Sequence, residues 1–211
     1  PIWQRRTCIG VGRSECGVGP CAASPSRPGV DSGLTLHGVL ASDDGVAFAS
    51  QVARLAEMTA TDLLPLLEAF ASEGVAYKVI GGVAMNLRGV TRATEDLDIF
   101  VRADAENIGR LRRALHANFH DPHIDEITSD DLAGEYPAVQ YIPPNGLFHL
   151  DILARLGEQW AYDDIETTDV LFGGVVVPVA TPAALVQMKS GTIRPQDHVD
   201  AARLRARFGL P

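Results

Sequence analysis

A pair of glycines, Gly81-Gly82, separates a short apolar stretch from a segment of helical character. The stretch from Val75 to Ile80 predicts a buried strand, and the residues from about Val83 to Arg88 predict a helix. Glycine permits a sharp turn between the two and lets another group approach the backbone closely. Free N–H groups at a helix start, together with the helix dipole, favour negative charge. The turn is therefore a candidate phosphate site, although many strand-to-helix turns use such a pair for geometry alone.

The next predicted strand carries two acids, Asp96 and Asp98. Alternate residues of a strand share a face, so the two Cα atoms lie roughly 6.5 to 7 Å apart on one side. Two like charges about 4 Å apart repel by about 4 kcal/mol at an effective dielectric near 20, which favours a cation between them. Mg²⁺ prefers oxygen ligands and leaves positions for water and phosphate. Two surface acids at a strand end are the alternative, but the glycine turn upstream favours magnesium and a nucleotide.

A third acid, Asp151, is the only one in the apolar run from Phe148 to Leu153, which follows the chain breaker at 143–146. A lone charge in such a run is costly to bury unless it is paired or binds a metal. Asp151 is therefore a candidate third metal ligand beside Asp96 and Asp98. In a two-metal mechanism it would bind the ion that activates the attacking hydroxyl, and it could take the proton. A strand-end acid bonded to an arginine or a backbone amide is the alternative.

The segment from Thr181 to Phe208 predicts two helices, with Thr181 as the first N-cap. Lys189 ends the first helix, where its ammonium could reach the β and γ phosphates of a nucleotide. Asp197 and Asp200 lie on the second helix. Acids in a first helical turn also suit the helix dipole, so both keep a purely structural interpretation.

Together these motifs resemble a nucleotidyltransferase of the DNA polymerase β superfamily, most closely the AbiEii/MenT-type toxins of bacterial toxin–antitoxin pairs. The resemblance runs from about Asp62 to the C-terminus. It implies an α+β fold in which a small mixed sheet is backed by helices and followed by C-terminal helices. It also implies a toxin that transfers a nucleoside monophosphate, with CTP the favoured donor and two Mg²⁺ ions as cofactors, to the 3′ end of tRNA and so blocks translation.

The same resemblance implies roles for single residues. Lys189 would contact the triphosphate, and Asp197, ahead of Asp200, would be the functional acid after it. Apart from the resemblance, Arg92 beside Gly81 and Gly82 could contact phosphate or nucleobase, or it could only pair with Glu95 and other surface acids. In some related toxins the cognate antitoxin phosphorylates a Ser at the position of Thr94. Thr94 is therefore a candidate regulatory site, with an antitoxin, acting as a kinase, as the partner. The alternative is a β-branched residue that favours the strand.

The N-terminal part differs in composition from the rest, so residues 1–57 are expected to be an extension and 58–211 the nucleotidyltransferase domain. Residues 1 to about 32 are rich in Gly, Pro, Ser and Arg, lack periodicity, and predict poor order. They hold all three cysteines, Cys8, Cys16 and Cys21, whose spacing favours reduced thiols over a zinc site. Residues 47–58 predict an amphipathic helix, and Met58 marks the expected start of the domain.

The remaining periodic segments fill in the expected fold. Helices are predicted from Thr61 to Gly74 and from Ala103 to Phe119, and further strands from Val139 to Ile142 and from Val175 to Val179. The second of these helices would turn Ile108 inward.

Charge sets the limits on partners. The formal net charge is −9 and the pI about 5.0, so strong nonspecific binding to nucleic acid is not expected. Arginines at 110, 112 and 113 and at 203, 205 and 207 could nevertheless form local basic patches. With no long apolar run and no signal segment, a cytoplasmic protein without a membrane partner is expected. Two alternatives stay open: nucleotidyl transfer to a small molecule or a protein, and a catalytically silent module that binds a partner.

Overall fold

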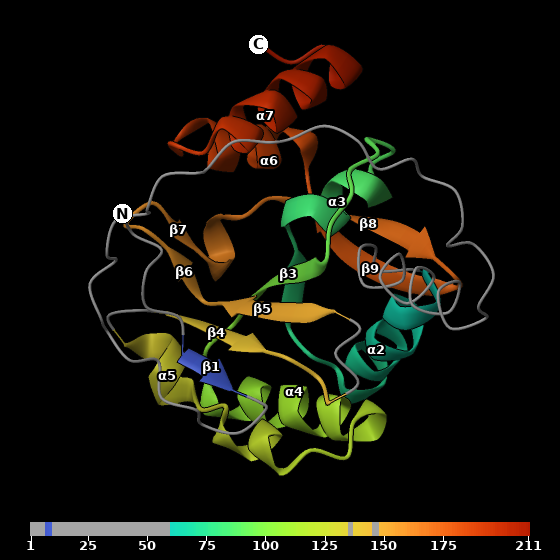
Figure 1. The fold of residues 1–211 in the computed structure, drawn as a ribbon, viewed down its shortest axis with the longest axis vertical. Helices are drawn as coiled ribbons and strands as arrows, with labels where there is room; N and C mark the ends of the chain where they lie inside the picture. The colour runs from blue at the N-terminus through green and yellow to red at the C-terminus, as the bar shows by residue number, and fades with distance from the viewer. Residues whose placement is uncertain (1–6, 10–59, 135–136, 145–147) are drawn as a thin grey trace, which may run out of the picture.

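A computed structural model describes residues 7–9, 60–134, 137–144 and 148–211 of the chain. The strands are, in chain order, β1 (Thr7–Ile9), β2 (Tyr77–Val79), β3 (Asp96–Val101), β4 (Ala138–Tyr141), β5 (His149–Leu153), β6 (Arg155–Leu156), β7 (Trp160–Ala161), β8 (Thr167–Phe172) and β9 (Val175–Ala180). Among the described residues, seven of these form one sheet in the order β1-β4-β5-β3-β2-β9-β8, and β6 pairs with β7 (Figure 1).

The sheet is mixed. Its centre is the parallel pair β3 and β5, and β2 runs antiparallel to β3 on the other side. β4 is antiparallel to β5, while β9 is parallel to β2 and antiparallel to β8. A parallel pair needs a crossover connection, and the chain between β3 and β5 supplies one that contains a long helix and β4.

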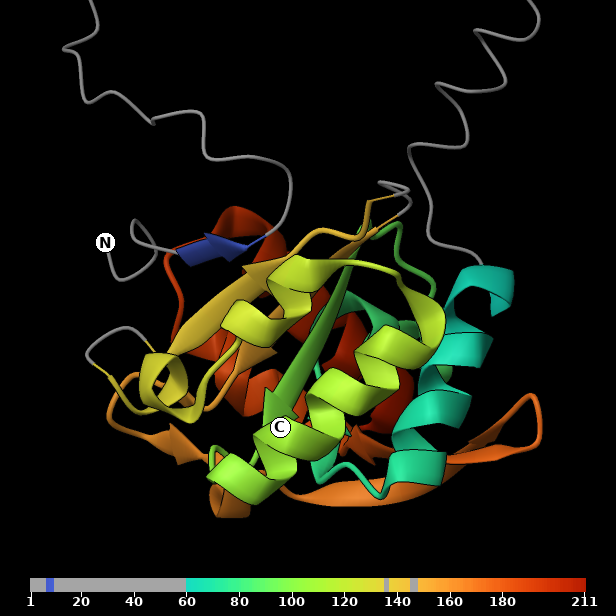
Figure 2. The same cartoon turned by 90° about the horizontal axis from the view of Figure 1, so that it is seen from below.

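Helices lie on two sides of the sheet. They are α2 (Ala60–Glu73), α3 (Gly81–Leu87), α4 (Ala105–Asn118), α5 (Ser129–Ala133), α6 (Pro182–Ser190) and α7 (Pro195–Phe208), with short 3₁₀ turns at Pro122–Glu126 and Tyr162–Asp164. In Figure 1, α6 and α7 lie above the sheet, and α4 and α5 below it. Figure 2 shows α2 and α4 side by side in front of the strands.

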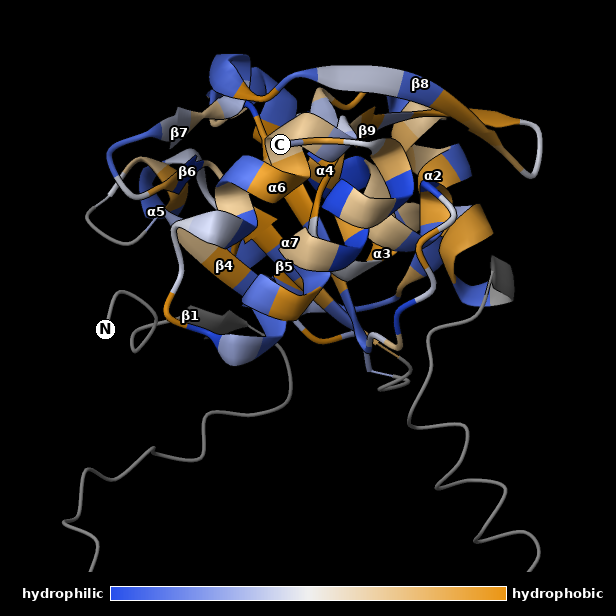
Figure 3. Ribbon diagram, turned by 90° about the horizontal axis from the view of Figure 1, so that it is seen from above, coloured by the Kyte–Doolittle hydropathy of each residue, from blue (hydrophilic) through white to orange (hydrophobic). Residues whose placement is uncertain are grey.

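Apolar spacing explains how α2 packs. Leu63, Leu66, Leu67 and Phe70 recur at the interval of one helix face, and all four are buried. The ring of Phe70 meets that of Tyr77 on β2 edge to face, with centroids 5.0 Å apart. β5 is buried along four of its five residues, as expected for a strand covered on both faces, whereas β4 alternates between half-buried and buried residues; Figure 3 colours both strands by hydropathy.

The mixed α+β architecture predicted from the sequence is confirmed. The predicted strands around 75–80, 139–142 and 175–179 correspond to β2, β4 and β9, and the predicted helices to α2, α4, α6 and α7. Two details differ. α3 begins at Gly81 itself, so the glycines are its first residues, and β1 forms within the N-terminal stretch that was expected to lack regular structure.

Several predictions fall outside the described part of the chain. The helix predicted for residues 47–58 is one of them, as are the surroundings of Cys16 and Cys21. None of the described helices combines the length and apolarity needed to cross a lipid bilayer.

Candidate active site

Asp98 and Asp151 are direct neighbours across the centre of the sheet. The register of the parallel pair β3 and β5 places Asp98 opposite Asp151 and Asp96 opposite His149. Neighbouring strands lie about 4.8 Å apart, so two acids 53 positions apart in sequence are held side by side by backbone pairing. Asp151 is buried, so its carboxylate meets Asp98 in a setting that water screens poorly.

Two polar partners hold the outer ends of this row of acids. Gln140 lies opposite Asp151 on β4 and donates from Nε2 to Asp151 Oδ1 at 2.8 Å. The Nδ1 atom of His149 lies 3.2 Å from Asp96 Oδ1. Alternation along β5 puts His149 on the same face as Asp151. Asp151 thus keeps an amide contact, and the Asp96 carboxylate is turned toward an imidazole.

These contacts decide how well a metal ion would fit. Among the described residues, no three His, Cys, Asp or Glu side chains are grouped as a metal site. Magnesium, however, usually takes only one or two carboxylates and fills its other positions with water and phosphate. The Asp98 and Asp151 pair meets that requirement for one ion, whereas Asp96 would have to leave His149 to join them.

The glycine turn packs directly against these acids. Gly81 has φ of +65°, a left-handed conformation that favours glycine, and a Cβ atom on it would overlap the carboxyl group of Asp98. Ile80 N donates to Asp98 O at 3.0 Å, which fixes the start of α3 to β3. The absence of a side chain at Gly81 is therefore what lets Asp98 lie against the first turn of α3.

Gly82 serves the next segment in the same way. A Cβ there would come within 2.5 Å of Arg92 Nη1 and 2.8 Å of the Thr94 hydroxyl oxygen. Asn86 secures this segment, since its amide accepts from Arg92 N at 2.6 Å and donates to Arg92 O at 2.8 Å. Thr94 donates to the Asp96 carbonyl at 3.2 Å. Arg92 and Thr94 therefore lie directly on the glycine turn.

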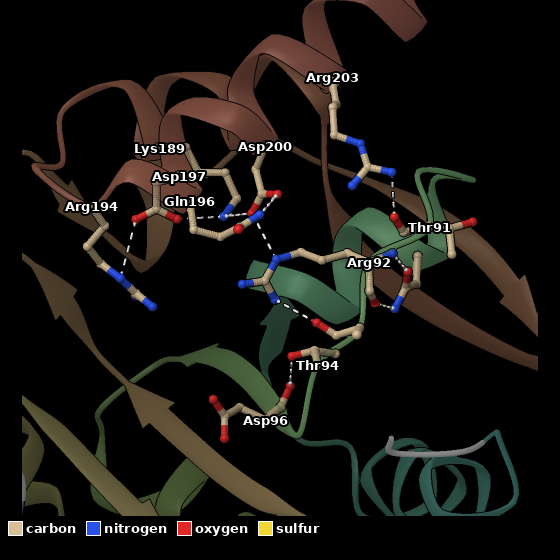
Figure 4. Close-up of polar contacts among 12 residues, drawn as sticks. Thr91, Arg92, Thr94, Asp96, Lys189, Arg194, Gln196, Asp197, Asp200 and Arg203 are labelled. Carbon is tan, nitrogen blue, oxygen red and sulfur yellow. Dashed lines mark hydrogen bonds and ion pairs between the residues drawn. The ribbon is translucent and has the colours of Figure 1, made fainter. Parts of the chain in front are cut away.

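Lys189 lies at the centre of a buried ionic network rather than at the end of a free arm (Figure 4). Its ammonium is 2.8 Å from Asp197 Oδ1 and 3.0 Å from Asp200 Oδ2. Asp200 is fully buried and also lies 2.9 Å from Arg92 Nε, and Gln196 donates to its other oxygen at 2.9 Å. The network joins α6, α7 and the segment before β3, so Asp200 orients the arginine that touches the glycine turn.

Asp197 faces the other side of the network. Thr192 donates to its Oδ2 at 2.9 Å, and Arg194 Nε lies 3.8 Å from the same oxygen. Burial by itself raises the pKa of Asp197, but the hydrogen bond and charge of Lys189, with the Thr192 hydrogen bond, outweigh it and hold that pKa below its ordinary value. Asp197 is thus ionised at neutral pH and paired.

A cleft of about 130 Å³ brings the predicted residues together. The acids, the turn and the C-terminal helices all contribute walls, although Asp200 lies behind them. Its polar lining includes the residues Gly81, Gly82, Arg92, Thr94, Asp96, Asp98, Asp151, Lys189 and Asp197.

Comparison with known proteins gives a likeness at the level of the fold. An antigenic nucleotidyltransferase-like protein from Paracoccidioides brasiliensis is 18% identical with a TM-score of 0.45, over 67% of this chain and 72% of that one. A candidate nucleotidyltransferase from Thermotoga maritima is 17% identical with a TM-score of 0.40, over 71% of this chain and 91% of that one. No family model and no curated protein matches the chain.

The sequence pointed to most of the cleft but not to its supporting residues. Gln140 and His149 were not singled out, although each is a polar residue within an apolar strand, which is the signal that identified Asp151. Asp200 was considered as a rival of Asp197. The structure places Asp197 on the cleft and Asp200 in the buried network behind it.

Proposed function

We propose that this protein is a magnesium-dependent nucleotidyltransferase that moves a nucleoside monophosphate from a nucleoside triphosphate to an acceptor hydroxyl. One observation carries the proposal: Asp98 and Asp151 are register partners on parallel strands, and the glycine turn lets the Asp98 carboxyl group lie directly against the first turn of α3. Two adjacent carboxylates are the ligands that Mg²⁺ commonly takes from a protein, and they leave its other positions to water and phosphate.

Residues at the two ends of the cleft have different proposed roles. Asp98 and Asp151 would hold magnesium, with Asp96 joining them once it leaves His149. When bound, the metal would activate the attacking hydroxyl and neutralise charge on the departing pyrophosphate. Asp151 would accept the proton of that hydroxyl. This division explains why the three acids come from two adjacent strands.

The positively charged side chains that would bind the triphosphate lie on the other wall of the cleft from these acids. The Arg92 guanidinium lies against Gly82 and is steered there by Asp200, so it is the side chain best placed to meet a phosphate on the turn. Lys189 borders the same cleft but is shared by two acids. Lys189 would therefore act on the phosphates mainly by its charge and by fixing α7.

We further propose a toxin of a toxin–antitoxin pair, acting in the cytoplasm with CTP as donor and the 3′ end of tRNA as acceptor. The motif resemblance supports this interpretation, and one exposed cation in the lining of the cleft would suit an RNA end: the Arg194 side chain is 58% exposed. The net charge of −9 favours a small or protein acceptor instead. An antitoxin that phosphorylates Thr94 would add negative charge beside Asp96 and oppose triphosphate binding.

Transfer of label separates these acceptors. The full chain is incubated with α-labelled CTP, ATP, GTP or UTP, Mg²⁺ and total tRNA, and parallel samples contain Asp96→Asn or receive EDTA. Label on RNA supports the tRNA proposal. Label on a small molecule or on protein would show that the acceptor is not tRNA, but it would still support nucleotidyl transfer. No label from any triphosphate with any acceptor class would overturn nucleotidyl transfer altogether.

A further inference from the structure

A second cavity adjoins the cleft and is the larger of the two, at about 420 Å³. It shares Leu156, Met188, Thr192 and Arg194 with the cleft. Its volume is within the range of ligand pockets, roughly 300 to 1,000 Å³. We call it the Trp160 cavity, after the aromatic residue in its wall. The cavity is therefore a direct neighbour of the cleft that holds the acids and the glycine turn.

The walls are apolar and held in place. On one side Trp160 of β7 pairs with Leu156 of β6, and both are half-buried against the core. On the other side, the connection between α6 and α7 is fixed by Thr192, whose hydroxyl donates to Asp197 at 2.9 Å, lies 3.3 Å from Lys189 O and accepts from Arg194 N. The cavity is thus bounded by a hairpin and a hydrogen-bonded loop.

An exposed apolar residue marks its rim. Ile193 lies between the two loop residues that are hydrogen-bonded, yet it is 89% exposed. Ile193 shares the lining of the cavity with Leu156, Trp160 and Met188, so the exposed side chain is part of one apolar surface rather than an isolated residue.

The charges of the cavity restrict its ligand. Glu158 and Arg194 are the charged residues of the described lining, one of each sign. A polycationic acceptor such as an aminoglycoside would need several acids, which this described lining does not offer. A flat, nearly neutral ring suits it better, because aromatic and guanidinium groups stack on the faces of bases.

We propose that the Trp160 cavity binds a nucleobase, which stacks on Trp160 and is covered by Ile193, while Arg194 contacts the adjoining phosphate. This inference rests on the proposed function, since it names the base of a nucleotide engaged in that same cleft. The base can come from the donor triphosphate or from the end of an acceptor strand. The two sources present the same chemistry to the cavity.

Tryptophan fluorescence tests the proposal directly. The chain has two tryptophans, so Trp3→Phe leaves Trp160 as the single reporter. Three ligands are titrated with Mg²⁺: a nucleoside triphosphate, a short single-stranded RNA with a free 3′ hydroxyl, and inorganic tripolyphosphate. Saturable quenching by the triphosphate assigns the donor base, and quenching by RNA alone assigns the acceptor base. No quenching by either, or equal quenching by tripolyphosphate, would overturn the proposal.

Variants separate stacking from folding. Calorimetry should show binding of the active ligand weakened roughly tenfold or more by Trp160→Ala but within about threefold of wild type for Trp160→Phe. Ile193→Ser, at an exposed position, should weaken binding by roughly threefold to tenfold, while Leu171→Ser, 73% exposed on distant β8, should change nothing. Equal effects of Ile193→Ser and Leu171→Ser would contradict the covering role.

The proposed base site and the proposed transferase reaction can be disproved independently of each other. Asp151→Asn should lower label transfer by roughly 100-fold or more, while Trp160 quenching should stay saturable at a raised ligand concentration, because Asp151 does not line the Trp160 cavity. Quenching without transfer in the wild-type chain would remove the proposed reaction and keep the base site. Transfer without quenching would keep the reaction and remove the base site.

Discussion

At the residue scale, the contact between Gly81 and Asp98 offers a sharp test of the turn. Gly81→Ala forces a Cβ onto the Asp98 carboxyl group, so the acid must move away from its place beside Asp151. Label transfer should fall by about 100-fold or more, as expected when a group that acts only on the reacting centre is displaced.

Gly89→Ala is the matched control for this change. Gly89 has a similar left-handed φ of +77°, but no atom of the described residues lies within 4 Å of the place that a Cβ would take there. Both variants should lose about 1 to 2 kcal/mol of stability from the backbone conformation, and Gly81→Ala should lose more because its Cβ overlaps Asp98. Only Gly81→Ala should lose transfer, and equal activity of the two variants would contradict the role of the turn.

Thr94 gives a second prediction at this scale. Thr94→Glu places a negative charge next to Asp96 and the Arg92 guanidinium, so it should weaken triphosphate binding and lower transfer by about tenfold or more. Thr94→Val keeps the shape without the hydroxyl and serves as the control. Initial rates against triphosphate concentration measure the effect, and full activity of Thr94→Glu would remove the regulatory proposal.

At the element scale, the ion pairs between α6 and α7 predict a pH-dependent stability. Pairing lowers the pKa of Asp197 in the folded chain below its ordinary 3.8, so the unfolded chain binds more protons in that range. The stabilisation is therefore complete above about pH 4 and is lost as the pH falls through the lower, folded-state pKa.

Urea unfolding of wild type and Asp197→Asn measures this directly. The variant should be less stable by about 1.5 kcal/mol near pH 7, and the difference should shrink below about pH 4. Asp169→Asn, at an exposed position of β8, is the control and should stay within about 0.5 kcal/mol at every pH. A difference that does not change with pH would rule out this pairing.

Local patterns predicted the elements well because each is encoded by adjacent residues. The alternation around Asp96 and Asp98 and the cap at Thr181, which accepts from Ala184 N at 3.2 Å, are short-range signals. The state of Lys189 is different. Its two acid partners lie 8 and 11 positions away on another helix, and which charges meet depends on how α6 and α7 pack.

At the scale of the whole molecule, the order of the strands in the sheet could not be predicted from local sequence patterns. The neighbours of β3 come from residues 77–79 and 149–153, and only the completed sheet sets Asp98 opposite Asp151. Buried Asn107 shows the same limit: its amide bonds to both backbone groups of Ala76 and to Arg102 O. A polar residue on a predicted helix does not reveal such distant partners.

The same scale gives a prediction about the N-terminal extension. A chain that begins at Met58 loses β1, a three-residue strand at the edge of the sheet, and keeps the described core. It should fold cooperatively, with a melting temperature lowered by no more than about 5 °C, and keep label transfer. Calorimetric scans of both chains test this, and an aggregated or non-cooperative short chain would show that the extension is part of the fold.

The rate of label transfer by Asp98→Asn, Asp151→Asn and the double variant is the decisive measurement for the paired acids. If both carboxylates hold one magnesium ion, each single change should cost roughly 100-fold or more, and the double variant should lose little beyond that, since residues acting as a unit are non-additive. Transfer that survives both substitutions would show that the chemistry, if any, lies elsewhere.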